Sequence, residues 1–172
     1  QVRQNAQRPE DPLPILRITN AGAARARGVE LDLNAKPTSW LTLWGSYSYL
    51  DAKYVQLVDN LNINRAGNRM IFSPENSFNI GGEIELPVTE KVNAFVRGEY
   101  RWQDTFFFDP ANNAVNTQEG YGLLDAAAGV RVGRLTAEVW GKNLADQLYR
   151  TNVIPFLGDR FAVYGPPRTY GL

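Results

Sequence analysis

The stretch that decides the fold is residues 121–149, YGLLDAAAGVRVGRLTAEVWGKNLADQLY. Apolar or small side chains occupy every second position from Leu124 to Val132, and the alternation resumes at Leu135 after residues 133–134. Period-two alternation on both sides of a two-residue connection predicts an antiparallel hairpin. Each arm runs for about ten to thirteen residues, whereas a common globular strand has about five or six and a membrane-crossing strand about nine to eleven. The hairpin is therefore typical of a membrane barrel.

The same alternation extends outward through the rest of the chain. The other segments that carry it are residues 15–35, 40–50, 77–86, 92–102 and a last strand from about residue 160 to the end. With the two arms of the hairpin they make about seven long strands. The sequence thus predicts an all-β fold with a repeated strand pattern.

The connections between these strands alternate in length. Those at residues 36–39, 87–91 and 133–134 are short, and those at residues 51–75, 104–120 and 147–159 are long. Outer-membrane barrels have short periplasmic turns and longer extracellular loops. We therefore expect residues 15–172 to form an antiparallel transmembrane β-barrel segment, and the polar, proline-containing residues 1–14 to be the remnant of an extracellular loop.

The face opposite the apolar side chains carries charges in the middle of the strands. They are Glu30, Asp32, Glu83, Glu85, Arg97, Glu99, Arg101, Asp125, Arg131, Glu138 and Lys142. A sandwich core could not accept them, because an unpaired buried charge costs several kcal/mol or more, whereas a polar lumen can. The alternative is a soluble one-sided sheet whose polar face meets water, which the length and uniformity of the strands disfavour. Within the lumen we expect Glu83 and Glu85 to pair with Arg97, Arg101 or Arg131 on neighbouring strands, the first two across the turn at residues 87–91.

Composition limits the possible functions. The 172 residues include 18 basic and 18 acidic side chains and no His or Cys. Zero net charge does not favour a nucleic-acid partner, and no apolar run is long enough for a transmembrane helix. Without His and Cys, Ser-His or Cys-His nucleophiles and the common zinc sites are excluded, so we expect no enzyme, no metal and no cofactor. The absence of Cys fits an oxidising compartment such as the outer membrane.

A few residues are candidates for contact with a ligand. Phe106, Phe107 and Phe108 form an aromatic run in a predicted extracellular loop, where exposed rings could clamp a ligand, anchor the loop in the outer leaflet or pack inside the barrel mouth. Trp44, Trp140 and Arg101 point to the predicted lumen, where they could meet a ligand or a plug. The ligand-contact prediction therefore covers these six residues.

Three motifs resemble those of the TonB-dependent outer-membrane receptors. Residues 20–30 resemble the NxGxAxxxGxE strand of that family, Leu124-Asp125 with residues 140–149 resemble its LD … KNLxDxxY signature, and residues 165–171 resemble its G-x-PRTYG strand. The motif residues are Gly28, Glu30, Asp125, Asn143, Leu144, Asp146, Tyr149, Pro167 and Arg168. From the residues alone, we expect residues 143–149 to have a structural role, ending a strand and shaping the next loop.

The resemblance implies the last seven strands of a plugged barrel of the 22-stranded class in the outer membrane of a Gram-negative bacterium. It also implies energised uptake of a scarce ligand, with siderophore-iron ahead of cobalamin or a carbohydrate. The implied partners are outer-membrane lipid, a plug domain of the same parent chain, the TonB complex and the small imported ligand. We expect the plug and the TonB-contacting box to lie outside this sequence. A passive porin-type channel is the alternative function.

Overall fold

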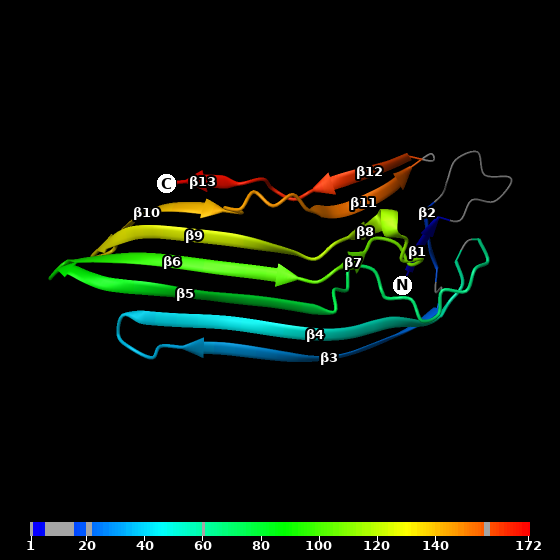
Figure 1. Cartoon of the computed structure of the whole chain (residues 1–172), viewed down its shortest axis with the longest axis horizontal. Coiled ribbons are helices and arrows are strands. Elements are labelled where there is room, and N and C mark those ends of the chain that lie inside the picture. Colours follow the sequence, from blue (N-terminus) through cyan, green and yellow to red (C-terminus); the bar gives the residue numbers. More distant parts are fainter. Residues whose placement is uncertain (1, 6–15, 20–21, 60, 157–158) are drawn as a thin grey trace.

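The computed structural model describes residues 2–5, 16–19, 22–59, 61–156 and 159–172 (Figure 1). Seven strands form one antiparallel sheet in the order β13-β10-β9-β6-β5-β4-β3, so that each strand pairs with its neighbours along the chain. These strands are β3 (Gly22–Ala35), β4 (Leu41–Leu57), β5 (Asn76–Thr89), β6 (Val92–Gln103), β9 (Tyr121–Val132), β10 (Leu135–Lys142) and β13 (Thr169–Gly171). The predicted all-β, antiparallel fold is confirmed. The sheet is open, with β3 and β13 at its edges.

Short hairpins accompany the large sheet. They are β1 (Val2–Asn5) with β2 (Leu16–Thr19), β7 (Phe106–Phe107) with β8 (Thr117–Gln118), and β11 (Arg150–Phe156) with β12 (Asp159–Tyr164). Of the predicted loop remnant at residues 1–14, only β1 lies within the described residues. A three-residue 3₁₀ helix, η1 (Ala114–Asn116), precedes β8, and the described residues contain no helix that could span a membrane.

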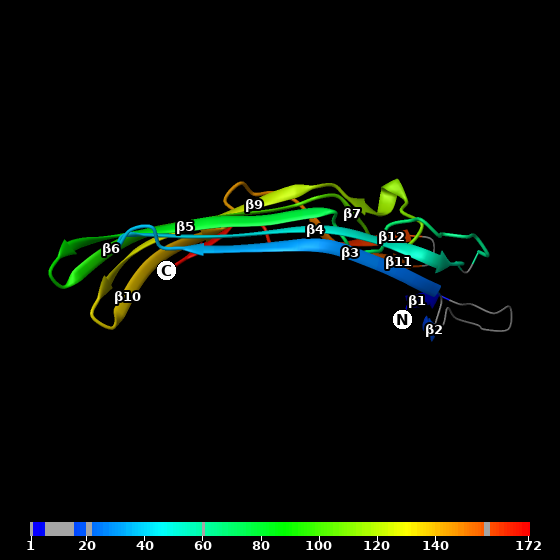
Figure 2. The ribbon, with the colours of Figure 1, turned by 90° about the horizontal axis from the view of Figure 1, so that it is seen from below.

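The strands lie side by side along the long axis of the molecule, and the sheet they form is curved (Figures 1 and 2). All short connections gather at one end of it, which we call the turn end: residues 36–40, 90–91 and 133–134. The long connections, residues 58–75, 104–120 and 143–168, gather at the opposite end, the loop end. The predicted sorting of short and long connections is therefore present. Gly133 has a φ of 59° at the tightest turn, a conformation that glycine adopts without steric cost.

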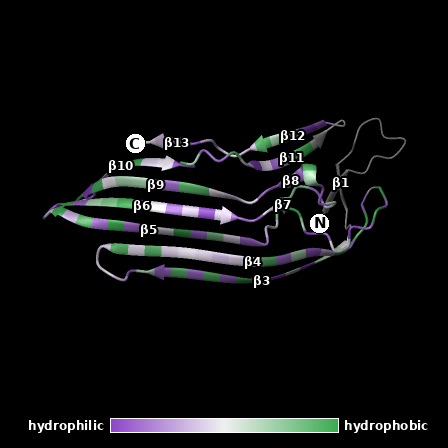
Figure 3. Ribbon diagram, viewed as in Figure 1, coloured by the Kyte–Doolittle hydropathy of each residue, from purple (hydrophilic) through white to green (hydrophobic). Residues whose placement is uncertain are grey.

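The two faces of the sheet differ in chemistry, as the alternating colours along the strands show (Figure 3). Register places every second residue of each strand on the same face: Leu31 lies opposite Tyr47, and Val96 lies opposite Ile84 and Ala128. On this apolar face Leu31 is 61% exposed and Val96 60% exposed. The apolar side chains are thus bare over the length of the sheet. The opposite, polar face carries the charges.

An aromatic row crosses the apolar face near the loop end. Tyr47 on β4, Phe78 on β5 and Trp102 on β6 are register partners in adjacent strands. The rings of Phe78 and Trp102 stack with centroids 5.6 Å apart. Aromatic girdles of this kind mark the membrane–water interface in transmembrane barrels.

The structure corrects some of the predicted strand ends. β4 continues to Leu57, seven residues into the predicted loop that begins at Asp51. From Asp51 onward the apolar and polar residues of the strand exchange faces. Asp51 and Lys53 form an ion pair at 2.7 Å on the face that is apolar earlier in the strand, and Ala52 and Tyr54 are buried. A period-two search ends a strand where such a switch occurs.

The last predicted strand and the loop before it are also corrected. β11 lies inside the predicted loop at residues 147–159 and pairs with β12. Only β13 joins the large sheet, through β10. The chain from residue 160 onward is therefore two short strands with different partners, because Gly165 to Arg168 intervene between them.

Candidate functional site: the polar face and its loop end

Register brings the predicted lumen charges of the central strands to one face. Glu83 on β5 lies opposite Arg97 on β6, and Glu99 on β6 lies opposite Asp125 on β9. Directly opposed residues of antiparallel strands have Cβ atoms within about 5.5 Å, close enough for long side chains to pair. The polar face is therefore a charged wall built by four adjacent strands.

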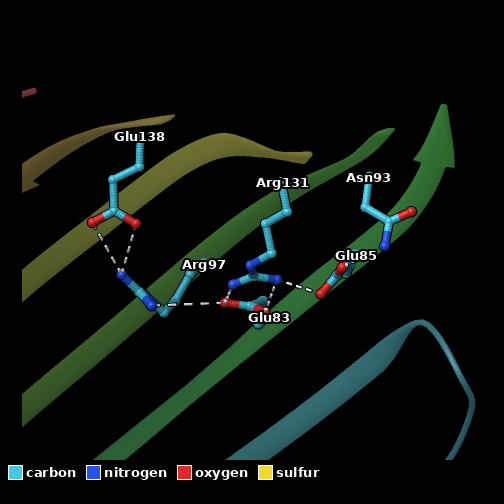
Figure 4. A network of polar contacts seen from close by, with 6 residues as sticks. All are labelled: Glu83, Glu85, Asn93, Arg97, Arg131 and Glu138. Atoms are coloured by element: carbon cyan, nitrogen blue, oxygen red, sulfur yellow. Dashed lines mark hydrogen bonds and ion pairs between the residues drawn. The ribbon is translucent and has the colours of Figure 1, made fainter. Parts of the chain in front are cut away.

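Toward the turn end, the charges form a continuous network (Figure 4). The Arg131 guanidinium donates to Glu83 at 2.9 Å and also bonds Glu85. Arg97 lies 3.7 Å from Glu83 and 3.3 Å from Glu138. The predicted pairing of Arg97 with Glu83 is confirmed. Glu85 pairs with Arg131, which is also among its predicted partners, and not with Arg97 or Arg101.

Each arginine of this network reaches across an intervening strand. Arg131 on β9 crosses β6 with its guanidinium 4.0 Å from the centroid of the Phe95 ring. Arg97 on β6 crosses β9 at its register partner Ala127, whose side chain is small. A cation over an aromatic face and a small residue under the second arginine give both long side chains a clear path. The network thus joins β10, β9, β6 and β5.

Arg101 lies closer to the loop end than the network. Its guanidinium donates to Asp125 Oδ2 at 2.6 Å and lies 3.4 Å from Glu99, not from Glu83 or Glu85 as predicted. Its side chain is 47% exposed, more than those of Arg97 and Arg131. Arg101 lines two neighbouring hollows of the polar face, one of about 340 Å³ and one of about 480 Å³. It is therefore the most accessible arginine of this wall.

The remaining charges that were predicted to face a lumen lie near the edges of the sheet. Glu30 and Asp32 on β3 are exposed and form no ion pair with another described residue. Lys142, at the end of β10, has its ammonium 5.6 Å from the Trp140 ring centroid. Among the described residues no three His, Cys, Asp or Glu side chains cluster in a way that could hold a metal ion.

The inward tryptophans each cover a glycine of the adjacent strand. A Cβ on Gly81 would lie 2.4 Å from the Trp44 ring, and a Cβ on Gly171 would lie 2.6 Å from the Trp140 ring. The indoles therefore lie over the neighbouring backbone, an arrangement that helps to fix the register of paired strands. Both rings remain partly exposed on the polar face.

The aromatic run in the second long connection is mostly buried. Phe106 and Phe108 are 6% and 8% exposed, and they pack with Val153 and Phe72, whose ring centroid lies 5.7 Å from that of Phe108. The expectation of three exposed rings is wrong for these two, because β11 and the first long connection cover them. Phe107 is partly exposed and lines a hollow of about 570 Å³.

The family motif forms a hydrogen-bonded knot at the loop end, which we call the motif knot: Asp125, Asn143 to Tyr149, and Gly165 to Arg168. Asn143 is 5% exposed and has a φ of 50°, which ends β10. Its Oδ1 accepts from the Gln147 backbone N–H at 2.8 Å. Its Nδ2 donates to the carbonyls of Gln147 at 3.0 Å and Pro166 at 3.1 Å. One amide side chain thus satisfies three backbone groups.

The other motif residues tie the same segments together. Asp146 Oδ1 accepts from the Arg168 backbone N–H at 2.9 Å. The Tyr149 ring lies over Gly165, where a Cβ would meet it at 1.9 Å. Gly28 packs closely against the Tyr49 carbonyl, which a Cβ would meet at 2.4 Å. These contacts are those of a structural motif, and Pro167 lies exposed beside them.

The three long connections are joined to one another. The Asn68 side chain donates to the Pro110 carbonyl at 2.9 Å. The Asn112 side chain accepts from the Arg69 backbone N–H at 2.8 Å and donates to the Arg69 carbonyl at 3.0 Å. Arg150 on β11 donates to the Thr117 carbonyl. Sequence reasoning missed these residues. The one available signal was asparagine itself, since Asn112 has a φ of 55° and Asn tolerates this conformation better than most residues.

A long antiparallel sheet with one charged face and one bare apolar face defines a segment of a transmembrane β-barrel. The profile of the family "TonB dependent receptor-like, beta-barrel" matches residues 2–144. This chain belongs to that family. No curated protein matches the sequence.

Solved structures with a similar fold are siderophore receptors. The ferric yersiniabactin uptake receptor FyuA from Yersinia pestis has a TM-score of 0.77 at 23% identity, over 91% of this chain and 23% of its own. For the ferric preacinetobactin receptor BauA from Acinetobacter baumannii the values are 0.69 and 22%, over 91% and 22%. For the ferric-catecholate import receptor Fiu from E. coli they are 0.66 and 21%, over 97% and 22%. At these identities the likeness establishes the fold alone, and the chain spans less than a quarter of each receptor.

Proposed function

We propose that this chain forms part of the barrel wall of an outer-membrane receptor that takes up a ferric siderophore with energy supplied through TonB. The observation that carries the proposal is the division of one sheet into a bare apolar face and a charged face. Family membership and the siderophore receptors among the similar structures support a transport receptor and favour a siderophore over cobalamin or a carbohydrate. Transport, not catalysis, is then its activity.

The two faces and the two ends take on defined environments in this proposal. The apolar face meets outer-membrane lipid, and the row of Tyr47, Phe78 and Trp102 lies at the interface. The polar face lines the lumen and faces a plug domain. The loop end is extracellular and the turn end periplasmic, as in other outer-membrane barrels. Residues 1–14 would then belong to an extracellular loop.

Arg101 is the proposed contact for an anionic ferric chelate. It is the most exposed of the three arginines of the wall and lines both central hollows. Trp140 lines the larger of these two hollows, where its partly exposed ring could contact a ligand. Trp44 is nearer the turn end and is proposed to contact the plug. Among the aromatic run, Phe107 keeps an accessible surface for ligand contact.

Uptake of labelled iron tests the function. The complete receptor gene would be expressed in a bacterium without its own siderophore receptors, and entry of a panel of ⁵⁵Fe-siderophores measured with and without a functional TonB complex. We expect uptake of at least one siderophore that depends on TonB. Entry that is independent of TonB would instead establish a passive channel. Uptake of cobalamin or a carbohydrate, but of no siderophore, would correct the ligand.

A matched pair of variants tests the wall residue. Arg101→Gln should raise the concentration for half-maximal uptake about tenfold, the effect of losing one charge-assisted hydrogen bond. Arg131→Gln removes the same charge from a position enclosed by Glu83 and Glu85 and should leave that concentration within about twofold. Equal effects would remove Arg101 from the proposed contact.

A further inference from the structure

Asp125 joins the charged wall to the rest of the motif knot. Its Oδ2 accepts from the Arg101 guanidinium at 2.6 Å, while its Oδ1 accepts from the Asn143 backbone N–H at 2.8 Å. The two oxygens of one carboxylate are therefore used by two different parts of the molecule. One partner is an exposed side chain of the polar face, and the other is the residue that ends β10.

On the other side of Asp125 is a segment whose conformation depends on side-chain hydrogen bonds. Asn143 and Asp146 have φ values of 50° and 52°, in the left-handed region that Asn and Asp enter more readily than other non-glycine residues. The bonds that hold it are Asp125 to the Asn143 N–H, Asn143 to the Pro166 carbonyl, and Asp146 to the Arg168 N–H. Such a segment rearranges when one of its supporting bonds weakens.

The segment of residues 143–168 also includes the β11–β12 hairpin at the loop end. The β11–β12 hairpin lies between residues 149 and 165, and the Gly165 N–H donates to the Tyr149 carbonyl at 2.9 Å where the hairpin closes. Arg150 at the start of β11 donates from its backbone N–H to Gln118 of the second long connection at 2.8 Å. A change at Asn143 therefore reaches the hairpin through a short path of direct bonds.

The Arg101 side of this link is accessible to solutes. Arg101 is 47% exposed, whereas Asp125 is 21% exposed. An anionic group that enters the central hollows can engage the Arg101 guanidinium and draw it away from Asp125. A carboxylate that loses its cation loses the partner that fixes its orientation, and the bond from Asn143 then weakens.

We propose that Asp125 is a positioning residue that couples the state of Arg101 on the polar face to the conformation of residues 143–168 at the loop end. An anion bound in the lumen would thereby loosen the β11–β12 hairpin. The identity of that anion rests on the proposed function. The coupling itself concerns residues of this chain and is tested without any ligand.

Hydrogen–deuterium exchange of the complete receptor in detergent measures the coupling. Asp125→Ala should speed exchange in residues 143–168 about tenfold, because a charge-assisted bond to backbone is lost. Arg101→Gln should speed exchange in the same residues about two- to fivefold, although Arg101 bonds to none of the described residues in that range. The control, Arg97→Gln, removes an arginine from the same strand and face but not from Asp125, and should leave those residues unchanged.

The double variant gives the decisive comparison. If Arg101 acts through Asp125, then Asp125→Ala combined with Arg101→Gln exchanges no faster than Asp125→Ala alone. Acceleration by Asp125→Ala with none by Arg101→Gln would reduce Asp125 to a local cap and overturn the proposal. Equal acceleration by Arg97→Gln, or additive effects in the double variant, would also overturn it. Because no ligand is present, failure here leaves the uptake proposal standing, and failure of the uptake assay leaves this result unaffected.

Discussion

The two ends of the sheet are held together in different ways. At the turn end, charged side chains bond to other charged side chains, as in the contacts of Arg131 with Glu83 and Glu85. At the loop end, a buried amide and two buried phenylalanines hold backbone segments, with Asn143 5% exposed and Phe106 6% exposed. Solvated ion pairs contribute about 0–1 kcal/mol each, whereas a buried polar group left unpaired costs about 1–3 kcal/mol. The loop end should therefore be the more sensitive to substitution.

The largest effect is expected for Phe106→Ala. It removes a buried ring from a small cluster and should destabilise the loop end by about 3 kcal/mol, the lower part of the range for such truncations, because a small cluster collapses readily. Limited proteolysis within residues 104–120 measures it as a faster cleavage rate. Phe107→Ala is the matched control, because the Phe107 side chain is partly exposed, whereas that of Phe106 is buried. The Phe107 carbonyl keeps its bond to the Phe72 N–H at 3.0 Å in the variant. Comparable cleavage of both variants would contradict the location of the core.

Asn143→Ala should follow, with a loss of about 2–3 kcal/mol at the loop end. Three backbone groups lose their partner, and alanine is strained at a φ of 50°. Asn143→Gly separates the two causes, because glycine accepts this φ but supplies no hydrogen bond. We expect the glycine variant to recover about 1 kcal/mol in urea unfolding of the loop segment. A glycine variant as stable as the wild type would show that the side-chain bonds contribute nothing.

A smaller loss is expected for Arg131→Gln at the turn end. The guanidinium is 30% exposed, so water screens its pairs with Glu83 and Glu85, and the loss of stability should be below about 1 kcal/mol. Raising the salt concentration should shrink the difference between variant and wild type further. A loss of stability equal to that of Asn143→Ala would contradict the greater sensitivity of the loop end to substitution.

The smallest effect concerns pH at one loop. The backbone N–H of Ile63, with help from Arg65 and the N–H of Leu61, lowers the pKa of Asp59 below its usual value. A depressed folded-state pKa gives stability that is present above the unfolded pKa of about 4 and is lost as the pH falls through the lower, folded value. Amide protection of Ile63, corrected for intrinsic exchange, should be constant from about pH 5 to 8 and fall below pH 4. Asp59→Asn should remove that dependence, and a persistent fall in this variant would assign it to another group.

The sheet itself could be predicted from the sequence because its signal is local. Alternation places Leu31, Val96 and Val130 on one face whatever the partner strands are, and the lengths of the connections order the strands. The charges of the polar face follow from the same rule. What alternation does not specify is which charge reaches which, since Arg97 and Arg131 each cross a whole strand to find a carboxylate.

The loop end could be predicted only in part. The sequence alone shows the motif residues from Asn143 to Tyr149, and the structural role it predicts for them agrees with the bonds they make. The burial of Phe106 and Phe108 could not be foreseen, because their neighbours Phe72 and Val153 are distant in sequence and belong to other connections. Packing between loops depends on long-range contacts that carry no periodic signal.

The most direct test of the central claim asks which environment each face of the sheet meets. Val96 and Arg97 are adjacent on β6 and lie on opposite faces. Each would be replaced by a spin-labelled cysteine in the complete receptor in membranes, and collision with oxygen, which concentrates in lipid, compared with collision with a water-soluble nickel chelate. We predict that the label at 96 favours oxygen and that the label at 97 favours the chelate. The reverse order, or equal accessibility at both positions, would contradict a lipid-facing apolar side and a lumen-facing charged side.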